Sequence, residues 1–454
     1  MIYTGHQLKE IVFPLGGIGT GSVGLAGNGR LCDFELFNRP NKGSLMGFTH
    51  FAVAAETAGR RDVRVLCGDC EKDLMGQYRK STFCGYGFGP DSGTMAGFPH
   101  FRDVTFDGRF PTATLTFREE HFPAPVRLTA FNPFIPHDAA ASSIPAAFFS
   151  VRLENPTAQP IAYTVYFTVC NPQKASVNRA GREGDLALVT LGADGVPQDS
   201  PAYGSLTCGV RGRDVGVQEY GYRGQWQDRP ATFWREISQV GSLRERHYDT
   251  PCAKGGDSAT VYARVTLAPG EEQSIPFVLA WHFPNRINDW NPWKDETGRD
   301  VVWRNYYATV FRDSAEVLRY AMAHFNTLLA RTVRFRDALY ASTVDPAVLD
   351  AAASNLAVLK SPTVLRLEDG RLWGWEGVHE LSGSCEGSCQ HVWSYAYALC
   401  FLFPELERGM RDTELEYAYD PQTGKTEFRV GLPLGRADYA PGTDDRHACL
   451  DGHM

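Results

Sequence analysis

The sequence lacks any run of about twenty apolar residues, the length that a membrane-spanning helix requires. It also lacks a long stretch of Lys and Arg, and its formal net charge is −8. A negative protein of this kind does not attract nucleic acid or an anionic membrane surface. We therefore expect no integral membrane segment and no nucleic-acid partner, and a small molecule or a neutral polymer fits better.

The N-terminus, MIYTGHQLKEIVFPL, has neither the basic segment nor the apolar run of a secretory signal. The chain has 11 cysteines, an odd number, which is not typical of a disulfide framework. Together these features predict reduced thiols and a cytoplasmic protein. The closest pairs are Cys67 with Cys70 and Cys385 with Cys389, and neither has a second pair of matching spacing nearby. Since structural zinc takes four ligands, we expect no metal site and no cofactor.

At 454 residues the chain is too long for one ordinary core, so two domains are expected. Up to about Phe283, short apolar or alternating segments are separated by Gly, Pro, Asn or Asp, which predicts strands. Many short strands without helical periods between them indicate a large antiparallel β-sandwich. The Gly-rich and charged stretch from Asn178 to Gln239 is expected to form long surface loops. The predicted strands are Phe48 to Ala55, Val63 to Cys67, Ala113 to Phe117, Val126 to Phe131, Ala147 to Leu153, Ala162 to Val169 and Thr260 to Leu267.

A glycine-rich segment near the N-terminus formally satisfies the dinucleotide-binding pattern G-x-G-x-x-G at Gly19, Gly21 and Gly24. The chain continues with Asn28-Gly29 and the strand-like LCDFELF, in the place where a dinucleotide site requires a helix. A nucleotide site is therefore not expected. The glycines instead predict bulges or close backbone approaches, followed by an Asn-Gly hairpin turn.

Helical periodicity begins near Trp303 and predicts one or two helices through Ser342. Asp345 and Pro346 form a cap and first position of another helix that ends before Ser361. Helices separated by loops indicate the beginning of a barrel of paired helices, while residues 410–454 are expected to be mostly turn and loop with a hairpin at 417–430. The predicted inward residues are Leu349, Ala352, Leu356 and Leu359 in this helix, and Val392, Tyr395, Ala396, Leu399, Leu402 and Phe403 in one helix before Pro404.

The stretch from Trp373 to Pro404 contains three acidic residues, two histidines and three tryptophans in a loop that leads into an apolar segment. Glu376 and Glu386 each precede a glycine. A carboxylate beside aromatic rings suits sugar chemistry, because rings pack on a pyranose and a carboxylate attacks or protonates at the anomeric carbon. For any single residue, a packed indole or a solvated carboxylate is the more common role.

The motif FPLGGIGTGSVGLAGNGRLCDFELFNRP, and later LWGWEG followed by CEGSCQHVWSYAYALCFLFPELER, resemble glycoside hydrolase family 116. This family includes non-lysosomal glucosylceramidases and bacterial and archaeal β-glucosidases. The resemblance implies an N-terminal β-sandwich packed on a C-terminal (α/α)6 barrel, the six-hairpin glycosidase fold. It also implies retaining hydrolysis of β-linked glucosides by a glutamate nucleophile and an aspartate acid/base. The expected domains are residues 1–285 for the sandwich, 286–345 for a helical linker and 346–454 for the first part of the barrel.

By this resemblance Glu376, in the W-E-G position, is the nucleophile, and Glu386 is its rival. His391 and Trp393 are candidates for lining the sugar pocket, although a helix-start hydrogen bond and a packed indole explain them equally well. Asp451, in DGHM, resembles a substrate-binding carboxylate, and the alternative is a simple turn residue.

The family's acid/base aspartate lies in later helices of the barrel, beyond all of these motifs. The sequence is therefore expected to be a truncated, N-terminal part of a β-glycosidase with little activity alone, and the remaining part of the catalytic domain is an expected partner. The alternative hypothesis is a non-catalytic carbohydrate-binding or scaffold module built on the β-sandwich, since that region is far larger than a simple immunoglobulin-type domain of about 100 residues.

Overall fold

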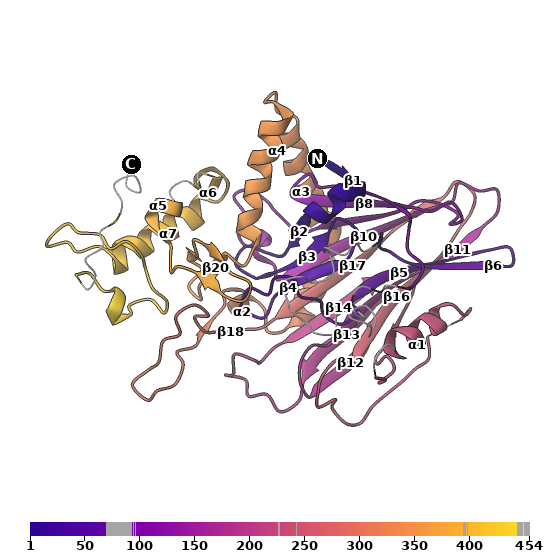
Figure 1. The fold of residues 1–454 in the computed structure, drawn as a ribbon, viewed down its shortest axis with the longest axis horizontal. Helices are drawn as coiled ribbons and strands as arrows, with labels where there is room; N and C mark the ends of the chain where they lie inside the picture. The colour runs from indigo at the N-terminus through magenta and orange to yellow at the C-terminus, as the bar shows by residue number, and fades with distance from the viewer. Residues whose placement is uncertain are drawn as a thin grey trace.

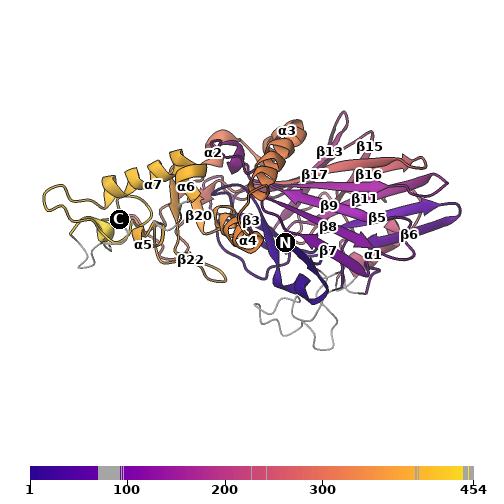
Figure 2. The same cartoon turned by 90° about the horizontal axis from the view of Figure 1, so that it is seen from above.

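The computed structural model describes residues 1–69, 93, 95, 97–225, 228–241, 243–393, 396, 398–442 and 448. Two large antiparallel sheets occupy one side of the molecule, and short helices and hairpins from the C-terminal part of the chain occupy the other (Figure 1). Seen from above, α3 and α4 stand between these two parts (Figure 2). The large antiparallel sandwich expected from the sequence is confirmed.

One sheet has nine strands and the other has five. The first runs β1 (Ile2–Thr4), β7 (Asp103–Asp107), β8 (Thr112–Arg118), β9 (Val126–Phe131), β10 (Ala146–Glu154), β17 (Glu272–His282), β14 (Ser205–Arg211), β13 (Leu186–Ala193) and β12 (Ser176–Glu183). The second runs β15 (Asp214–Gln218), β16 (Ser258–Leu267), β11 (Ile161–Cys170), β5 (His50–Thr57) and β6 (Arg60–Val65). Each predicted strand lies in one of these sheets.

Aromatic rings fill the space between the two sheets. Phe51 of β5 stacks on Phe167 of β11, with ring centroids 4.0 Å apart. Its edge meets Phe149 of β10 and Phe277 of β17, at 5.2 and 5.4 Å. Because all four rings are buried, this cluster joins the sheets by apolar contact alone.

The glycine-rich segment forms β2 (Val12–Leu15), β3 (Ser22–Ala26) and β4 (Leu31–Glu35), and a short 3-10 helix (Gly5–Glu10) precedes it. The turn between β3 and β4 contains Asn28 and Gly29, and the register shifts between Ser22 and Gly24. Gly19 has a positive φ of 72°, and a Cβ there would lie 2.4 Å from the backbone nitrogen of Arg366. The predicted hairpin, bulge and close approach are all confirmed, so these glycines serve packing.

The expectation of long surface loops from Asn178 to Gln239 is wrong. This stretch contains most of β12, all of β13, β14 and β15, and helix α1 (Asp228–Ile237). The side chains of β13 and β14 are buried almost without interruption, but glycine and threonine stand among the apolar residues, which hid the strand pattern in composition. Helix α1 packs Phe233 and Ile237 into a cluster on the outer face of the five-stranded sheet.

The helices predicted after Trp303 are α2 (Tyr307–Val310) and α3 (Ser314–Tyr340). They follow the short pair β18 (Asn285–Arg286) and β19 (Trp303–Arg304). Asp313 caps α3, where its side chain accepts a hydrogen bond from the Glu316 nitrogen at 2.7 Å. The apolar stripe of α3, including Val317 and Phe325, packs on the outer face of the nine-stranded sheet.

The next helix, α4 (Pro346–Asn355), continues as a 3-10 turn (Leu356–Lys360). Asp345 caps it as predicted, accepting from the Ala347 nitrogen at 2.9 Å. Leu349 and Leu359 are buried, but Ala353 takes the inward position that was expected for Ala352. Both spacings from Leu349 fit one helix face, so the sequence alone does not choose between them.

The C-terminal part consists of short elements: β20 (Val364–Arg366), β21 (Leu372–Gly374), β22 (Gly377–Val378), β23 (Gly383–Ser384), α5 (Gln390–Trp393), α6 (Ala398–Leu402), α7 (Pro404–Tyr417) and a 3-10 turn (Ala437–Tyr439). One helix was expected before Pro404, but the described residues form two short helices there, α5 and α6. Of its expected inward residues, Leu399 and Phe403 are buried, while Tyr395 lies outside the described residues.

The loop expected from Met410 is also wrong, because α7 extends to Tyr417. Its outer face is charged, with Arg411 paired to Glu407 at 2.8 Å one turn earlier, so it lacks the broad apolar stripe that marks a helix. The predicted hairpin is present as a bridge between Tyr419 and Thr426. In the part of the chain that the structure describes, no helix combines the length and the apolar character needed to cross a bilayer.

Candidate functional site

Glu376 lies in the turn between β21 and β22, on a backbone held by two buried tryptophans. Trp373 donates from Nε1 to the carbonyl of Val430 at 2.9 Å, and its ring meets that of Trp375 edge-on at 4.6 Å. The backbone nitrogen of Glu376 donates to the Ser384 carbonyl at 3.2 Å. The carboxylate therefore projects from a fixed position.

The Glu376 side chain is 26% exposed and pairs with Arg429, whose Nη2 lies 2.6 Å from Oε1. Partial burial raises the pKa of Glu376, but this effect is outweighed by the hydrogen bond and charge of Arg429 and by hydrogen bonds with Cys389 and Cys385. The resulting pKa is lower than that of an ordinary glutamate. Glu376 is therefore an ionised, partly accessible carboxylate at neutral pH.

Sequence reasoning missed the three residues around Glu376. Cys385 and Cys389 were considered only as a metal-binding pair, and Arg429 follows Glu376 by 53 residues, with no local spacing that links them. Burial, together with the neighbouring Glu376, raises the pKa of the Cys389 thiol, which keeps it protonated as a donor. Cys385 adopts a positive φ of 58°, a backbone conformation that is uncommon for residues other than glycine.

Glu386 is different, because its carboxylate is buried and fully occupied. Its Oε1 accepts hydrogen bonds from Asn288 Nδ2 at 3.0 Å and from Arg436 Nη1 at 3.3 Å. Its Oε2 accepts from the hydroxyl of Tyr439. The side chain is 3% exposed. Through these contacts Glu386 links the loop after β18, which carries Asn288, to the segment that carries Arg436 and Tyr439.

Of the other predicted site residues, the structure describes Trp393 and His391. Trp393 is buried, donates from Nε1 to the Trp375 carbonyl at 3.2 Å, and packs so closely on Gly374 that a Cβ there would lie 2.1 Å from the indole. His391 is on α5 with an exposed side chain. Asp451 lies outside the described residues. Trp393 thus supports the backbone beside Glu376.

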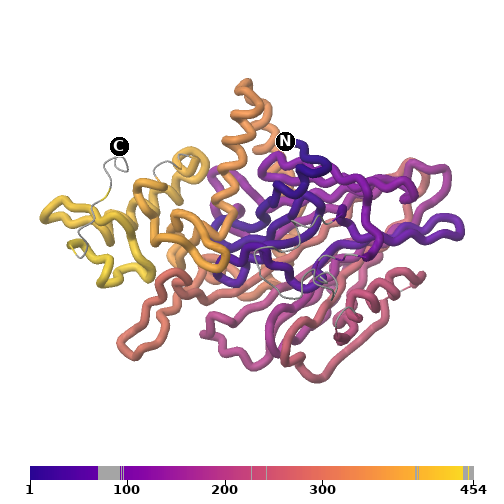
Figure 3. The backbone as a smooth tube through the Cα atoms, viewed as in Figure 1, coloured from indigo at the N-terminus to yellow at the C-terminus, as the bar shows by residue number. Residues whose placement is uncertain are grey.

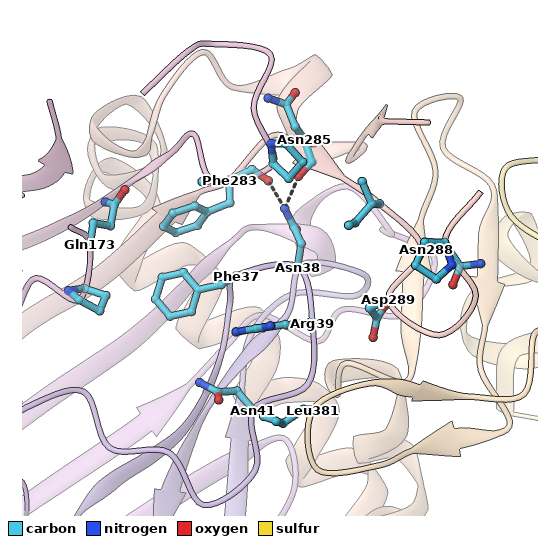
Figure 4. Close-up of a pocket in the computed structure, with 15 residues that line it drawn as sticks. Phe37, Asn38, Arg39, Asn41, Gln173, Phe283, Asn285, Asn288, Asp289 and Leu381 are labelled. Carbon is cyan, nitrogen blue, oxygen red and sulfur yellow. Dashed lines mark hydrogen bonds between the residues drawn. The ribbon is translucent and has the colours of Figure 1, made fainter. Parts of the chain in front are cut away.

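The hairpin β22–β23 connects this site to the sandwich. At its tip, the backbone nitrogen of Lys42 donates to the Glu380 carbonyl at 2.9 Å, and the rings of Trp290 and His379 stack with centroids 5.5 Å apart. At its base, the Gly383 nitrogen donates to Asp289 Oδ2 at 2.7 Å. Figure 3 shows the chain between residues 285 and 304 extending alongside the C-terminal part. A pocket of about 750 Å³ opens between this hairpin and the sandwich loops (Figure 4).

Among solved structures, the chain is similar to a protein from the human microbiome described as a kojibiose phosphorylase, with 11% identity and a TM-score of 0.28, over 57% of this chain and 27% of that one. It is similar to a polysaccharide lyase with 12% identity and a TM-score of 0.27, over 60% and 32%. It is similar to a protein from Klebsiella pneumoniae described as an aldose 1-epimerase, with 9% identity and a TM-score of 0.22, over 57% of this chain and 76% of that one. TM-scores this low establish neither a shared fold nor a shared activity.

The chain covers less than two thirds of the length of the first two of these proteins. A family model gives a stronger result. The model described as "beta-glucosidase 2, glycosyl-hydrolase family 116 N-term" matches residues 12–328, which is more than two thirds of the chain. This range includes the glycine-rich segment, every strand of both sheets except β1, and the first half of α3, so the chain belongs to glycosyl-hydrolase family 116.

Proposed function

We propose that this chain is part of a retaining glycoside hydrolase that acts on β-linked glucosides or related β-glycosides, with Glu376 as the nucleophile. The observation that best supports this proposal is the ionisation, exposure and position of the Glu376 carboxylate. It is ionised, partly accessible and fixed between tryptophan-supported backbone and Arg429. A glycosidase nucleophile must be ionised to attack the anomeric carbon.

The surroundings of the two glutamates favour Glu376 over Glu386. A nucleophile needs an oxygen that can approach the sugar, but both oxygens of Glu386 accept hydrogen bonds, Oε1 from buried Asn288 and Arg436 and Oε2 from half-buried Tyr439. Freeing Glu386 would leave the Arg436 guanidinium poorly compensated in a buried site, which is costly. At Glu376, Arg429 pairs with Oε1 and the thiols of Cys385 and Cys389 also donate, yet the side chain stays partly exposed.

In the proposed mechanism, Glu376 attacks the anomeric carbon while a carboxylic acid protonates the departing glycosidic oxygen. The sugar is then bound to Glu376 as an ester, and water, deprotonated by the same second carboxyl group, releases it with retained configuration. The two carboxyl groups should lie about 5–5.5 Å apart. We propose that the second one is the aspartate that the family carries in the later helices of its barrel.

The same proposal assigns residues 1–285 to the sandwich domain, 286–345 to a linker and 346–454 to the first part of an (α/α)6 catalytic domain. Two long-range contacts support this proposal by tying the last region to the rest of the chain. The backbone nitrogen of Lys42, in the sandwich domain, donates to the Glu380 carbonyl, and the Gly383 nitrogen donates to Asp289, in the linker. His391 and Asp451 are proposed to contact substrate in the completed barrel.

The test is hydrolysis of an aryl β-glucoside by the complete enzyme, meaning this chain together with the remainder of its catalytic domain. Glu376→Gln should lower kcat more than about a thousandfold, because the nucleophile of a covalent mechanism is lost. Glu380→Gln, four residues away on the hairpin, is the matched control and should retain activity. Full activity in Glu376→Gln would reject the assignment.

A second measurement identifies the attacking residue directly. A 2-deoxy-2-fluoro β-glucoside with a good leaving group should accumulate a covalent glycosyl-enzyme, and mass spectrometry of its peptides locates the ester. We expect the label on the peptide that carries Glu376. A label on Glu386 instead would transfer the role to the rival residue, and turnover with inverted configuration would exclude a retaining mechanism.

A further inference from the structure

The pocket between the sandwich and the β22–β23 hairpin is built by segments far apart in the sequence. Phe37 and Arg39 come from the loop after β4, Gln173 from the loop after β11, and Phe283 from the loop after β17. Leu381, at the hairpin tip, closes the side nearest the C-terminal part (Figure 4). With a volume of about 750 Å³, it is in the size range of small-molecule sites.

Part of the pocket wall is held rigidly by asparagine side chains. Asn38 donates from Nδ2 to the carbonyls of Phe283 and Asn285, at 3.0 and 2.7 Å, and accepts from Asn305 at 2.7 Å. Asn288 donates to Glu386 and accepts from the nitrogen of Trp290 at 3.0 Å. These amides are occupied, so they shape the pocket and offer little to a ligand.

Two polar groups in the wall are left over. The Nε2 atom of Gln173 is buried and has no hydrogen-bond partner in the described structure. Arg39 has an exposed guanidinium, for which the described residues show no hydrogen bond or ion pair. A buried donor without a partner requires an explanation, and an absent ligand or water is one. Both groups are donors, so the ligand that fits them presents acceptor oxygens.

The remaining surface is apolar and partly aromatic. Phe37 lies edge-on to Phe283 with ring centroids 4.9 Å apart, and Phe37 is only half-buried. Pro172, Pro201 and Leu381 extend this surface. A sugar ring combines an apolar C–H face with hydroxyl oxygens around its edge. It therefore matches an apolar wall with two donors better than a purely charged or purely apolar ligand does.

We infer that this pocket is a second saccharide-binding site, distinct from the Glu376 site, which takes sugar residues of a hydroxyl-rich glycan. Leu381 lies five positions after Glu376 in the chain, so at about 3.3 Å per residue the two residues are at most roughly 17 Å apart. Arg39 donates to the sugar oxygens and Phe37 packs on its ring, while the buried amide of Gln173 turns into the pocket to donate as well. The saccharide class rests on the proposed function, but binding here does not require hydrolysis at Glu376.

Isothermal titration calorimetry of this chain with cellotriose tests the site. The double substitution of Arg39→Ala and Gln173→Ala should weaken binding about tenfold or more, since it removes two hydrogen bonds, one of them charged. The control is Arg213→Ala. This exposed arginine lies in the turn after β14, at the end of that strand away from the pocket. It should bind as the unsubstituted chain does, and so should Glu376→Gln.

Three results would overturn the inference. The first is that cellotriose fails to bind the unsubstituted chain. The second is that Arg213→Ala weakens binding as much as the double substitution does. The third is that Glu376→Gln abolishes binding while the double substitution leaves it unchanged. Failure of Glu376→Gln to lower hydrolysis would reject the proposed nucleophile without affecting this site.

Discussion

The sandwich and the segment after Pro346 are stabilised in different ways. In the sandwich, Phe51 and its neighbours join two sheets through buried rings without polar groups. In the later segment, charged side chains are buried at the points of attachment, among them Lys360 and Glu386. Apolar contacts therefore build the sandwich, whereas specific polar contacts determine how the candidate site is placed on it.

Lys360 shows this second kind of contact most clearly. Its ammonium group is 1% exposed and donates to the carbonyls of Asn132 and Pro133, at 2.7 and 3.1 Å, and to the Asn132 side chain. Burial moves the pKa of Lys360 well below that of an ordinary lysine. Since oxygen dipoles of the loop after β9 satisfy its three donors, Lys360 attaches the end of α4 to the sandwich.

The largest effect on stability is expected in the sandwich. Phe51→Ala removes a ring from the cluster between the sheets and leaves a cavity, so we expect the free energy of unfolding to fall by about 3–5 kcal/mol. Denaturant unfolding monitored by circular dichroism measures this. Val240→Ala, at a side chain that is 75% exposed, is the control and should change stability by less than about 0.5 kcal/mol. Equal effects of the two substitutions would contradict the apolar description of the sandwich.

A smaller and local effect is expected at the polar attachment. Glu386→Gln removes the charge opposite Arg436, which among the described residues keeps Asp438 as its one carboxylate partner, at 2.8 Å. We expect a loss of about 2–3 kcal/mol, limited to the C-terminal part. Hydrogen exchange should show faster exchange of residues 430–439 with unchanged protection in β10 and β17.

Glu376→Gln is the matched control for Glu386→Gln, because it makes the same chemical change at a partly exposed ion pair. Its effect on stability should stay below about 1 kcal/mol. If both substitutions destabilise the chain equally, or if the sandwich loses protection together with residues 430–439, the two regions do not differ in their stabilising contacts.

The sequence predicted those features that depend on local pattern. Alternating apolar residues located β10, β11 and β16, and the Asp345-Pro346 cap located α4. The Asn-Gly turn and the close approach of Gly19 also followed from local chemistry. By contrast, α7 was missed because its exposed face carries paired charges, and the strands between Asn178 and Gln239 were missed because the glycine-rich and charged composition of that stretch concealed them.

The arrangement of the candidate site could not be predicted in this way. Glu376 was identified from its motif, but Arg429 lies 53 residues further along the chain. Asn288, which donates a hydrogen bond to the Glu386 carboxylate, lies 98 residues before it. Such contacts depend on how separate segments pack together, and no spacing in a single sequence reports them. The distinction between an accessible and an occupied carboxylate therefore required the structure.

The smallest effect on stability, and the most specific effect on chemistry, is expected from Arg429→Met in the complete enzyme. Arg429 lowers the pKa of Glu376, so the ionised form is present at pH values above that lowered pKa. Without the guanidinium the pKa rises, and the acid limb of the kcat/KM profile on an aryl β-glucoside should move to higher pH. Arg371→Met is the matched control, because Arg371 pairs with Glu416 at the same distance of 2.6 Å in an exposed position. It should leave the acid limb unchanged. An acid limb that does not move in Arg429→Met would show that the carboxylate controlling the reaction is not the one that Arg429 contacts.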